Sequence, residues 1–553
     1  MANKQKQKNT KEYSPSARPE CPEGMYRRGK SSTSTLSQKT IIKKTVEVAS
    51  STLLSRFFGI VREVLMVRYL GASGLSDAFL TAYKIPNSLR KIFAEGALSA
   101  AFIPTVVSTI KQDDKNAVAG LMSLAFLIFE GMVLILCALI MTYADYVIRF
   151  IAPGFSEQQI IDAIPMLHIL MPFIFFISSS ALLGGALHAV GHFFTPAIAP
   201  VIVNIIFIAG LCISMLLNLP VTYLCWFIVF AGSIHFVLHL TMYFRFHFGF
   251  GKISRNDVTV FGRVMGKFLL CLPSVSLMEV ALFIDTSFAS LLAPGSISLL
   301  FYANRFVGIP LGVFAVAFST ILLPHFSRVN SSNPKRLHFY LLESAKFIFW
   351  VTIPVALFMA FFSEEIFSTM FLSQKFTSAH VHEAARILLA FLVGLFFFSL
   401  NKILLNIFYA MHAAWIPALV ALGATGINII LNMLFIEQLQ TVGLALATTI
   451  SSIAQTIFFV AILRKKYDFR IYFVPFISFV TKYLAQLSCF SMCFWILYRA
   501  CIYVISAHMS PSVALFFTTQ VGLWMWVGPL VLFFFILLYY SHTFFRVRLH
   551  FLK

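Results

Sequence analysis

The stretch IPNSLRKIFAEGALSAAFIP, residues 85–104, is hydrophobic enough for a membrane, yet it is interrupted by charges. Five charged residues lie in it or just before it: Asp77, Lys84, Arg90, Lys91 and Glu95. On an α-helix all but Arg90 share, with Ser88 and Ser99, one face about 80° wide, and the other faces are apolar. Charges inside a membrane helix are costly and usually face one another or a water-filled cavity. The stretch therefore predicts a spanning helix with one polar face.

The rest of the chain has the composition of a polytopic membrane protein. Its 553 residues are 59% hydrophobic and 12% charged, with a mean hydropathy of +0.85. The apolar runs lack the two-residue alternation of a spanning β-barrel. Runs of about 20 residues, each long enough to span a bilayer as a helix, recur along the chain. We predict an all-α fold with about 14 transmembrane helices, at residues 46–70, 76–107, 119–143, 159–188, 195–218, 221–244, 264–291, 296–327, 338–362, 382–411, 415–436, 440–463, 472–503 and 512–541.

The net charge of +20 is distributed asymmetrically between the connections. Eleven Lys and Arg residues fall within residues 1–47, and other basic clusters lie between or after spans at residues 245–255, 328–336, 464–470 and 546–553. The alternate loops, at residues 71–76, 219–221 and 293–296, contain no Lys or Arg. The positive-inside rule therefore predicts that both termini are cytoplasmic. We interpret the basic tail as a topology determinant that contacts anionic lipids rather than as a nucleic-acid binder.

Three pairs of similar segments indicate an internal duplication. TAYK at 81–84 resembles YANR at 302–305, GFSE at 154–157 resembles KFTS at 375–378, and HAVGHFFTPA at 188–197 resembles YAMHAAWIPA at 409–418. Each pair is offset by 221 residues, as Ala82 and Ala303 show. An even number of spans per repeat gives two parallel lobes around a central site. We predict four regions: a disordered tail (1–45), an N-lobe (46–250), a C-lobe (251–466) and two added helices with the C-terminal tail (467–553).

Cations outnumber acids in a set of nine charged residues, each of which lies in the first two spans of a lobe. The acids are Glu63, Asp77 and Glu95, and the cations are Arg56, Arg62, Lys84, Arg90, Lys91 and Arg305. A simpler interpretation pairs Lys91 with Glu95 and lets Asp77 and Arg62 reach the membrane interface. Pairing does not neutralise the whole set, and Arg side chains match phosphate geometry. The pattern favours a wet cavity between the lobes that binds an anion.

The segment SRFFGIVREVLMVRYLGASGLSDAFLTAYKIPNSLRKIFAEGALSAAFIP, residues 55–104, resembles the N-terminal signature of the MurJ (MviN) family. GSISLLFYANRFVGIPLGVFAVAFSTILLPHFS, residues 295–327, is similar to its second-lobe counterpart. The likeness extends from about residue 45 to the end. It implies a 14-helix lipid II flippase of the bacterial inner membrane, from the multidrug/oligosaccharidyl-lipid/polysaccharide exporter superfamily. Such a protein moves undecaprenyl-pyrophosphate-linked disaccharide-pentapeptide to the outer leaflet, with the lipid tail in a groove of spans 13 and 14.

The resemblance also implies functional residues. The family's sensitive cavity positions match Arg56, Arg62, Asp77, Arg90, Glu95 and Arg305, and the polar face adds Lys84. A family Asp is replaced by Asn304, which leaves the cavity more cationic. Some members have a sodium site, which here would comprise Asp285, Asn428, Asn432 and Thr448. Because an acid of that site is replaced by Asn432, contacts within the helix bundle are the alternative. We predict no other cofactor.

Other functions stay open at this point. One is a flippase for another lipid-linked oligosaccharide, and another is a drug/cation antiporter of the same superfamily, which would favour acids in its cavity. The sequence contains no metalloprotease motif, P-loop or nucleophile elbow, so we predict a transporter rather than an enzyme. A scaffold role of residues 1–45 is a further alternative. We expect a monomer whose partners are lipid II and anionic lipids.

Overall fold

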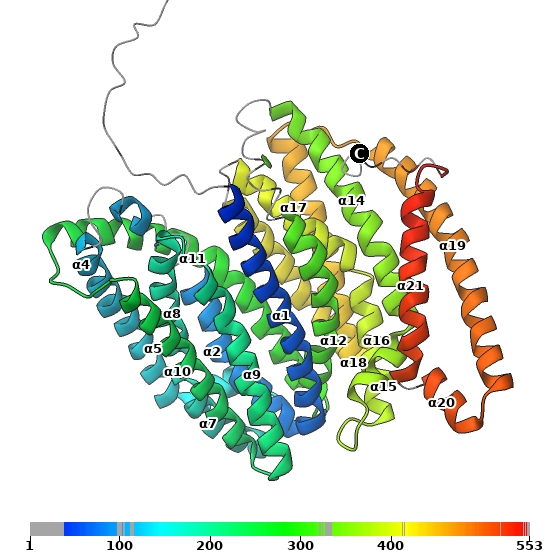
Figure 1. The fold of residues 1–553 in the computed structure, drawn as a ribbon, viewed down its shortest axis with the longest axis horizontal. Coiled ribbons are helices and arrows are strands. Elements are labelled where there is room, and N and C mark those ends of the chain that lie inside the picture. The colour runs from blue at the N-terminus through cyan, green and yellow to red at the C-terminus, as the bar shows by residue number, and fades with distance from the viewer. Residues whose placement is uncertain are drawn as a thin grey trace, which may run out of the picture. The chain divides into compact units, whose positions relative to one another are not determined.

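The structure is a computed structural model, and it describes residues 38–96, 102, 105–110, 116–319, 322, 325–326, 334–411, 413, 415–519, 521–545, 547 and 549. It divides into two units, Met1–Val46 and Glu47–Lys553. The first helix begins at Gln38, within the range predicted as tail, and residues 1–37 lie outside the described part. All regular structure in the described residues is helical (Figure 1), as the composition predicts.

The first lobe contains the helices up to residue 245. They are α1 (Gln38–Leu70), α2 (Gly74–Arg90), η1 (Lys91–Gly96), α4 (Asn116–Ala125), η2 (Phe126–Glu130), α5 (Gly131–Thr142), α6 (Ala144–Ile151), α7 (Glu157–Leu170), α8 (Pro172–Ala189), α9 (Phe194–Leu216) and α10 (Val221–Arg245). The η elements are π-helical segments that continue the helix before them. Helices α7, α8, α9 and α10 pack together and, with α2, enclose most of the N-lobe core.

The second lobe and the added helices follow. They are α11 (Arg255–Ser290), α12 (Ser296–Pro310), η3 (Leu311–Val316), α14 (Pro334–Phe361), α15 (Ser363–Phe371), α16 (Ser378–Leu392), α17 (Leu395–Ala410), α18 (Trp415–Lys466), α19 (Phe473–His508), α20 (Pro511–Thr519) and α21 (Val521–Ser541). Gln440, with φ 48° and ψ −127°, interrupts α18, so this element is two helices that match the two predicted spans. Helix α19 packs on α14, and α21 packs on α19 (Figure 1).

The two lobes repeat one another in local detail. Ser156 caps α7 and Thr377 caps α16, each with a capping box, and these positions are one repeat apart. The π-helical segments η1 and η3 begin at Lys91 and Leu311, within one residue of repeat-related positions. Phe155 and Phe376, which the sequence comparison paired, are both buried. The structure is therefore a parallel repeat of two lobes with an added C-terminal pair.

Nine helices in the described residues are long and apolar enough to span a membrane, or ten if the pair Ser378–Leu392 and Leu395–Ala410, bent by 45°, is one span. Helix α18 counts once among them although Gln440 divides it. The helices α1, α2 and α11 carry many of the charges discussed above and are not among the nine. The number of 14 spans therefore stays a prediction.

Candidate functional site: a cationic cavity between the lobes

A cavity of about 1030 Å³ lies between the two lobes. Its N-lobe wall comes from α1, α2 and η1, and its C-lobe wall from α11, α12, η3, α15, α16, α17 and α18. Among the described residues its charged lining consists of seven cations and two acids: Arg56, Arg62, Lys84, Arg90, Lys91, Arg305 and Lys402 against Glu63 and Asp285. The surplus of positive charge predicted from the sequence is thus gathered around one space.

Glu63 is the centre of a cluster of three charges in the cavity wall. Its Oε1 accepts a hydrogen bond from the Arg62 guanidinium at 2.7 Å and lies 3.3 Å from Nε of Arg305, which belongs to the other lobe. Its Oε2 is buried and has no partner among the described residues. Arg62 also donates to Asn204 Oδ1 at 2.9 Å. One carboxylate therefore holds two arginines of opposite lobes, so both are only partly neutralised.

Two further predicted cations of the N-lobe, Arg56 and Lys84, reach the C-lobe. Arg56 donates to the backbone carbonyl of Gly312 at 3.3 Å, and Lys84 donates to the carbonyl of Leu282 at 2.9 Å and to the Thr286 hydroxyl. Arg90 remains near its own helix, where it donates to Asn87 at 3.2 Å. All three line the cavity.

Lys91 pairs with Glu279 of α11, with Nζ 3.1 and 3.2 Å from the two carboxylate oxygens. The simpler interpretation had paired Lys91 with Glu95 on its own helix. The side chain of Glu95 lies outside the described residues, so its predicted place in the cavity is not described. Glu279 was not among the predicted residues, although an acid within an apolar span was a signal for it.

Asp77 is outside the cavity lining, unlike the other predicted cavity residues that the structure describes. Its carboxylate is buried and accepts from the backbone N–H groups of Gly295 at 2.7 Å and Ser298 at 2.8 Å, and from the Ser298 hydroxyl. It thus caps the N-terminus of α12, where the helix dipole favours an anion. Asp77 and Ser298 are one repeat apart in sequence, so equivalent positions of the two lobes bind each other.

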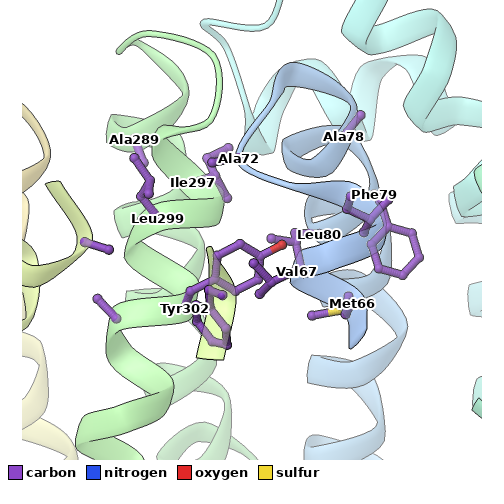
Figure 2. Close-up of a cluster of buried hydrophobic side chains, with 14 of the residues drawn as sticks. Met66, Val67, Ala72, Ala78, Phe79, Leu80, Ala289, Ile297, Leu299 and Tyr302 are labelled. Carbon is purple, nitrogen blue, oxygen red and sulfur yellow. The ribbon is translucent and has the colours of Figure 1, made fainter. Parts of the chain in front are cut away.

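Further contacts surround this cap and join the lobes at the same end. Tyr302 of α12 donates to the carbonyl of Gly71 at 3.2 Å, and Lys375 donates to the carbonyl of Tyr69 at 2.7 Å. Figure 2 shows Tyr302 beside Val67 and Leu80 of the N-lobe, within one continuous apolar core. We call the contacts of Asp77, Gly295, Ser298, Tyr302 and Lys375 with the opposite lobe the interlobe latch. It lies at the end that the charge distribution predicts to be external.

The four residues of the predicted sodium site are brought together between α11 and α18. The Asn432 amide nitrogen lies 3.1 Å from Asn428 Oδ1 and 3.5 Å from Asp285 Oδ1, and the Asn428 amide lies 3.4 Å from Thr448 Oγ1. Asn432 Oδ1 is buried without a partner among the described residues. A set of oxygen ligands that includes one amide carbonyl without a hydrogen-bond partner is of the kind that binds a hard cation such as sodium. The positive charge of Lys84 also acts on Asp285, so it would compete with a bound cation for this carboxylate.

Two helical lobes around a polar cavity, with a latch at one end, define a two-lobe membrane transporter. Comparison with known proteins identifies the family of transporters. Residues 66–535 match the family model described as lipid II flippase MurJ. The lipid II flippase MurJ of Burkholderia cenocepacia is 30% identical over 434 residues, which cover 77% of this chain and 84% of that protein.

Solved structures agree on the fold. The inward closed conformation of a lipid II flippase MurJ superposes with a TM-score of 0.72 at 24% identity, over 91% of this chain and 99% of that one. An inward-facing multidrug resistance transporter of the MATE family of the MOP superfamily gives a TM-score of 0.64 at 14% identity, over 75% and 96%. The chain belongs to the MurJ family of lipid II flippases, a family of transporters rather than enzymes.

Proposed function

We propose that this protein moves lipid II from the inner to the outer leaflet of the bacterial inner membrane, by alternating access of the cavity between its lobes. The observation that carries the proposal is the cavity lining, in which seven cations face two acids in the described residues. The undecaprenyl-pyrophosphate headgroup brings at least two negative charges, and crossing about 30 Å of hydrocarbon without counter-charges would be prohibitive. Arginine donors from both lobes would lower that cost.

Glu63 would control the exchange between the empty and loaded cavity. In the structure the Glu63 carboxylate forms ion pairs with both Arg62 and Arg305. A pyrophosphate that enters would compete with the carboxylate for the same guanidinium groups. Because Glu63 takes the arginines back when the anion leaves, it would keep the affinity low enough for release. Asn304, which lines the cavity beside Arg305, adds no negative charge to this competition.

The interlobe latch supports the alternation. It ties the lobes together at the predicted external end, so the cavity would load from the cytoplasmic leaflet in this state. Reversing the access requires the latch to separate. The repeat-related π-helical segments of η1 and η3 are positions where each lobe's second helix departs from regular geometry, and such segments often mark functional sites.

The added helices would hold the lipid tail. An apolar hollow of about 250 Å³ lies among η3, α14, α19 and α21, and its lining includes Trp350, Tyr483 and Phe535. Among the described lining residues, Trp350 and Tyr483 alone have side chains that could form hydrogen bonds, and the Tyr483 hydroxyl already donates to the carbonyl of Trp350 at 2.6 Å. The hollow is therefore suited to a hydrocarbon chain.

Two related functions differ in what they would transport. A drug/cation antiporter would need a cavity in which acids prevail, opposite to the lining observed here. A flippase for another lipid-linked oligosaccharide would use the same pyrophosphate contacts. Leaflet-resolved labelling of lipid II in a bacterium depleted of its own flippase and supplied with this protein decides between them. Accumulation of lipid II in the inner leaflet despite normal expression would refute the proposal.

The orientation of the chain is itself a prediction. With a cysteine-free background, we expect a cysteine at Ala293 to react with an impermeant thiol reagent added outside the cell, and a cysteine at Ser254 to stay unlabelled. Both positions are exposed in the structure, so burial does not decide the result. Permeabilised cells, in which both must react, are the control. Labelling at Ser254 alone would invert the topology.

We also propose sodium as a ligand of Asp285, Asn428, Asn432 and Thr448. The bound ion would supply positive charge to the oxygen atoms that face one another between α11 and α18. We expect sodium, but not choline at equal ionic strength, to raise the thermal unfolding temperature of the purified protein. Asp285→Asn should abolish this difference, because it removes the one carboxylate of the set. Equal unfolding temperatures of the wild type in both salts would eliminate the site.

A further inference from the structure

Lys402 differs from every other described cation of the cavity in having no partner. Arg56, Arg62, Lys84, Arg90, Lys91 and Arg305 each form at least one of the hydrogen bonds or ion pairs given above. Lys402, on α17 of the C-lobe, is half-buried and lines the cavity. No hydrogen bond, ion pair or ring contact involves its ammonium group in the part of the chain that the structure describes.

The electrostatic surroundings of Lys402 favour the binding of an anion. The charge that acts on it is that of Lys91, across the cavity on the N-lobe. Lys91 itself forms an ion pair with Glu279. Two lysines from opposite lobes that line the same cavity therefore repel each other. An anion placed there would be attracted by both lobes at once.

Uncharged donors stand next to the same space. Asn401 donates to Ser452 Oγ at 3.0 Å and to Gln455 Oε1 at 3.1 Å, and its own carbonyl accepts from Thr456 at 2.7 Å. This network fixes the carbonyl side of Gln455 toward Asn401. The Gln455 amide nitrogen forms none of the hydrogen bonds in the described residues, and Gln455 lines the cavity. An ammonium and a free amide are thus presented by adjacent helices, α17 and α18.

We propose that Lys402, with Gln455 on the neighbouring helix and Lys91 on the other lobe, forms a second anion subsite of the cavity, which binds a carboxylate of the substrate's peptide. The inference rests on the proposed function, since only then does the ligand carry both a pyrophosphate and peptide carboxylates. The arginines around Glu63 offer the forked donors that suit pyrophosphate, whereas a lysine is a point charge that suits a single carboxylate. Separate subsites would let the cavity distinguish lipid II from other undecaprenyl pyrophosphates.

The test compares three ligands on the full-length protein in detergent: lipid II with free peptide carboxylates, the same lipid with those carboxylates amidated, and undecaprenyl pyrophosphate. Dissociation constants are measured for the wild type, Lys402→Gln, Lys402→Arg and the control Lys465→Gln, an exposed lysine at the end of α18. Losing one charge-assisted hydrogen bond should weaken lipid II binding about 10-fold to 100-fold in Lys402→Gln. Binding of undecaprenyl pyrophosphate should stay unchanged, Lys402→Arg should keep most of the affinity, and the control should match the wild type.

Each other outcome has a distinct meaning. Equal wild-type affinity for free and amidated lipid II would overturn the subsite without any variant. An equal loss for undecaprenyl pyrophosphate in Lys402→Gln would assign Lys402 to the pyrophosphate instead, and also overturn it. The proposed function fails separately, if the wild type binds none of the three lipids or if Arg305→Ala leaves all three affinities unchanged.

Discussion

Alanine in place of Arg305 should abolish lipid II translocation while the protein remains in the membrane. Arg305 is the C-lobe member of the pair that Glu63 holds, so its loss removes the guanidinium that the second lobe offers to the pyrophosphate. The Arg305 side chain is 45% exposed in the empty cavity, so the full effect requires that the bound substrate excludes water from it. Removing one partner of such a desolvated charge pair typically costs about 2–5 kcal/mol, which corresponds to about 30-fold to several thousand-fold in binding. Arg56→Ala, on the N-lobe side, should have the same direction of effect.

Three further variants separate charge from geometry. Arg305→Lys keeps the charge and should rescue poorly, because an ammonium cannot make the forked contact. Glu63→Gln frees both arginines from a competing carboxylate, so the substrate should bind more tightly and leave more slowly. Arg464→Ala, an exposed arginine in the last turn of α18, is the matched control and should support growth.

Complementation of a flippase-depleted bacterium measures these effects, with expression checked by immunoblotting and lipid II binding measured on purified protein. Growth of the Arg56→Ala/Arg305→Ala double variant at the wild-type rate and expression level would show that the substrate crosses without the cationic cavity. Tighter binding in Glu63→Gln together with slower translocation would show in turn that the carboxylate acts in release.

Much of the fold follows from the sequence because it depends on local signals. Apolar runs of spanning length, a capping Ser or Thr one repeat apart at Ser156 and Thr377, and alternation of basic and uncharged loops are each readable within a few residues. The helical-wheel analysis also found the polar face of α2, and Lys84, Ser88 and Lys91 of that face do line the cavity.

Such local signals did not predict how deep a residue lies along its helix or which residues of the other lobe it contacts. Asp77 shares the face of Lys84, but it lies two turns nearer the helix start, where it meets the N-terminus of α12 instead of the cavity. Its partners are 218 and 221 residues away, and no periodicity relates a residue to a neighbour on another lobe. For the same reason the sequence showed Glu63 as an acid near Arg56, without indicating that it joins Arg62 to Arg305.

The second large effect concerns Asp77, whose replacement by alanine should open the cavity at the end that is predicted to be external. Gly295, the N-cap of α12, has no side chain to satisfy the first N–H groups of its helix, and Asp77 of the other lobe does so instead. Asp77→Ala would leave two buried N–H groups without an acceptor and remove a negative charge from the positive end of the helix dipole. Each unsatisfied group costs about 1–3 kcal/mol, so the closed state would lose about 2–6 kcal/mol relative to an open state that hydrates them.

A shift of this size moves the ratio of open to closed molecules by at least about 30-fold. A cysteine at Asn304, which lines the cavity, reports it through an impermeant thiol reagent applied from outside. Labelling should be slow in the otherwise wild-type protein and much faster with Asp77→Ala, and translocation should fall because the inward-facing state is depleted. The control is Asp145→Ala, an exposed acid that pairs with Arg149 within the N-lobe and joins no lobes. Unchanged labelling in a well-expressed Asp77→Ala protein would mean that the apolar contacts of Tyr302 with Val67 and Leu80 hold this end closed without the cap.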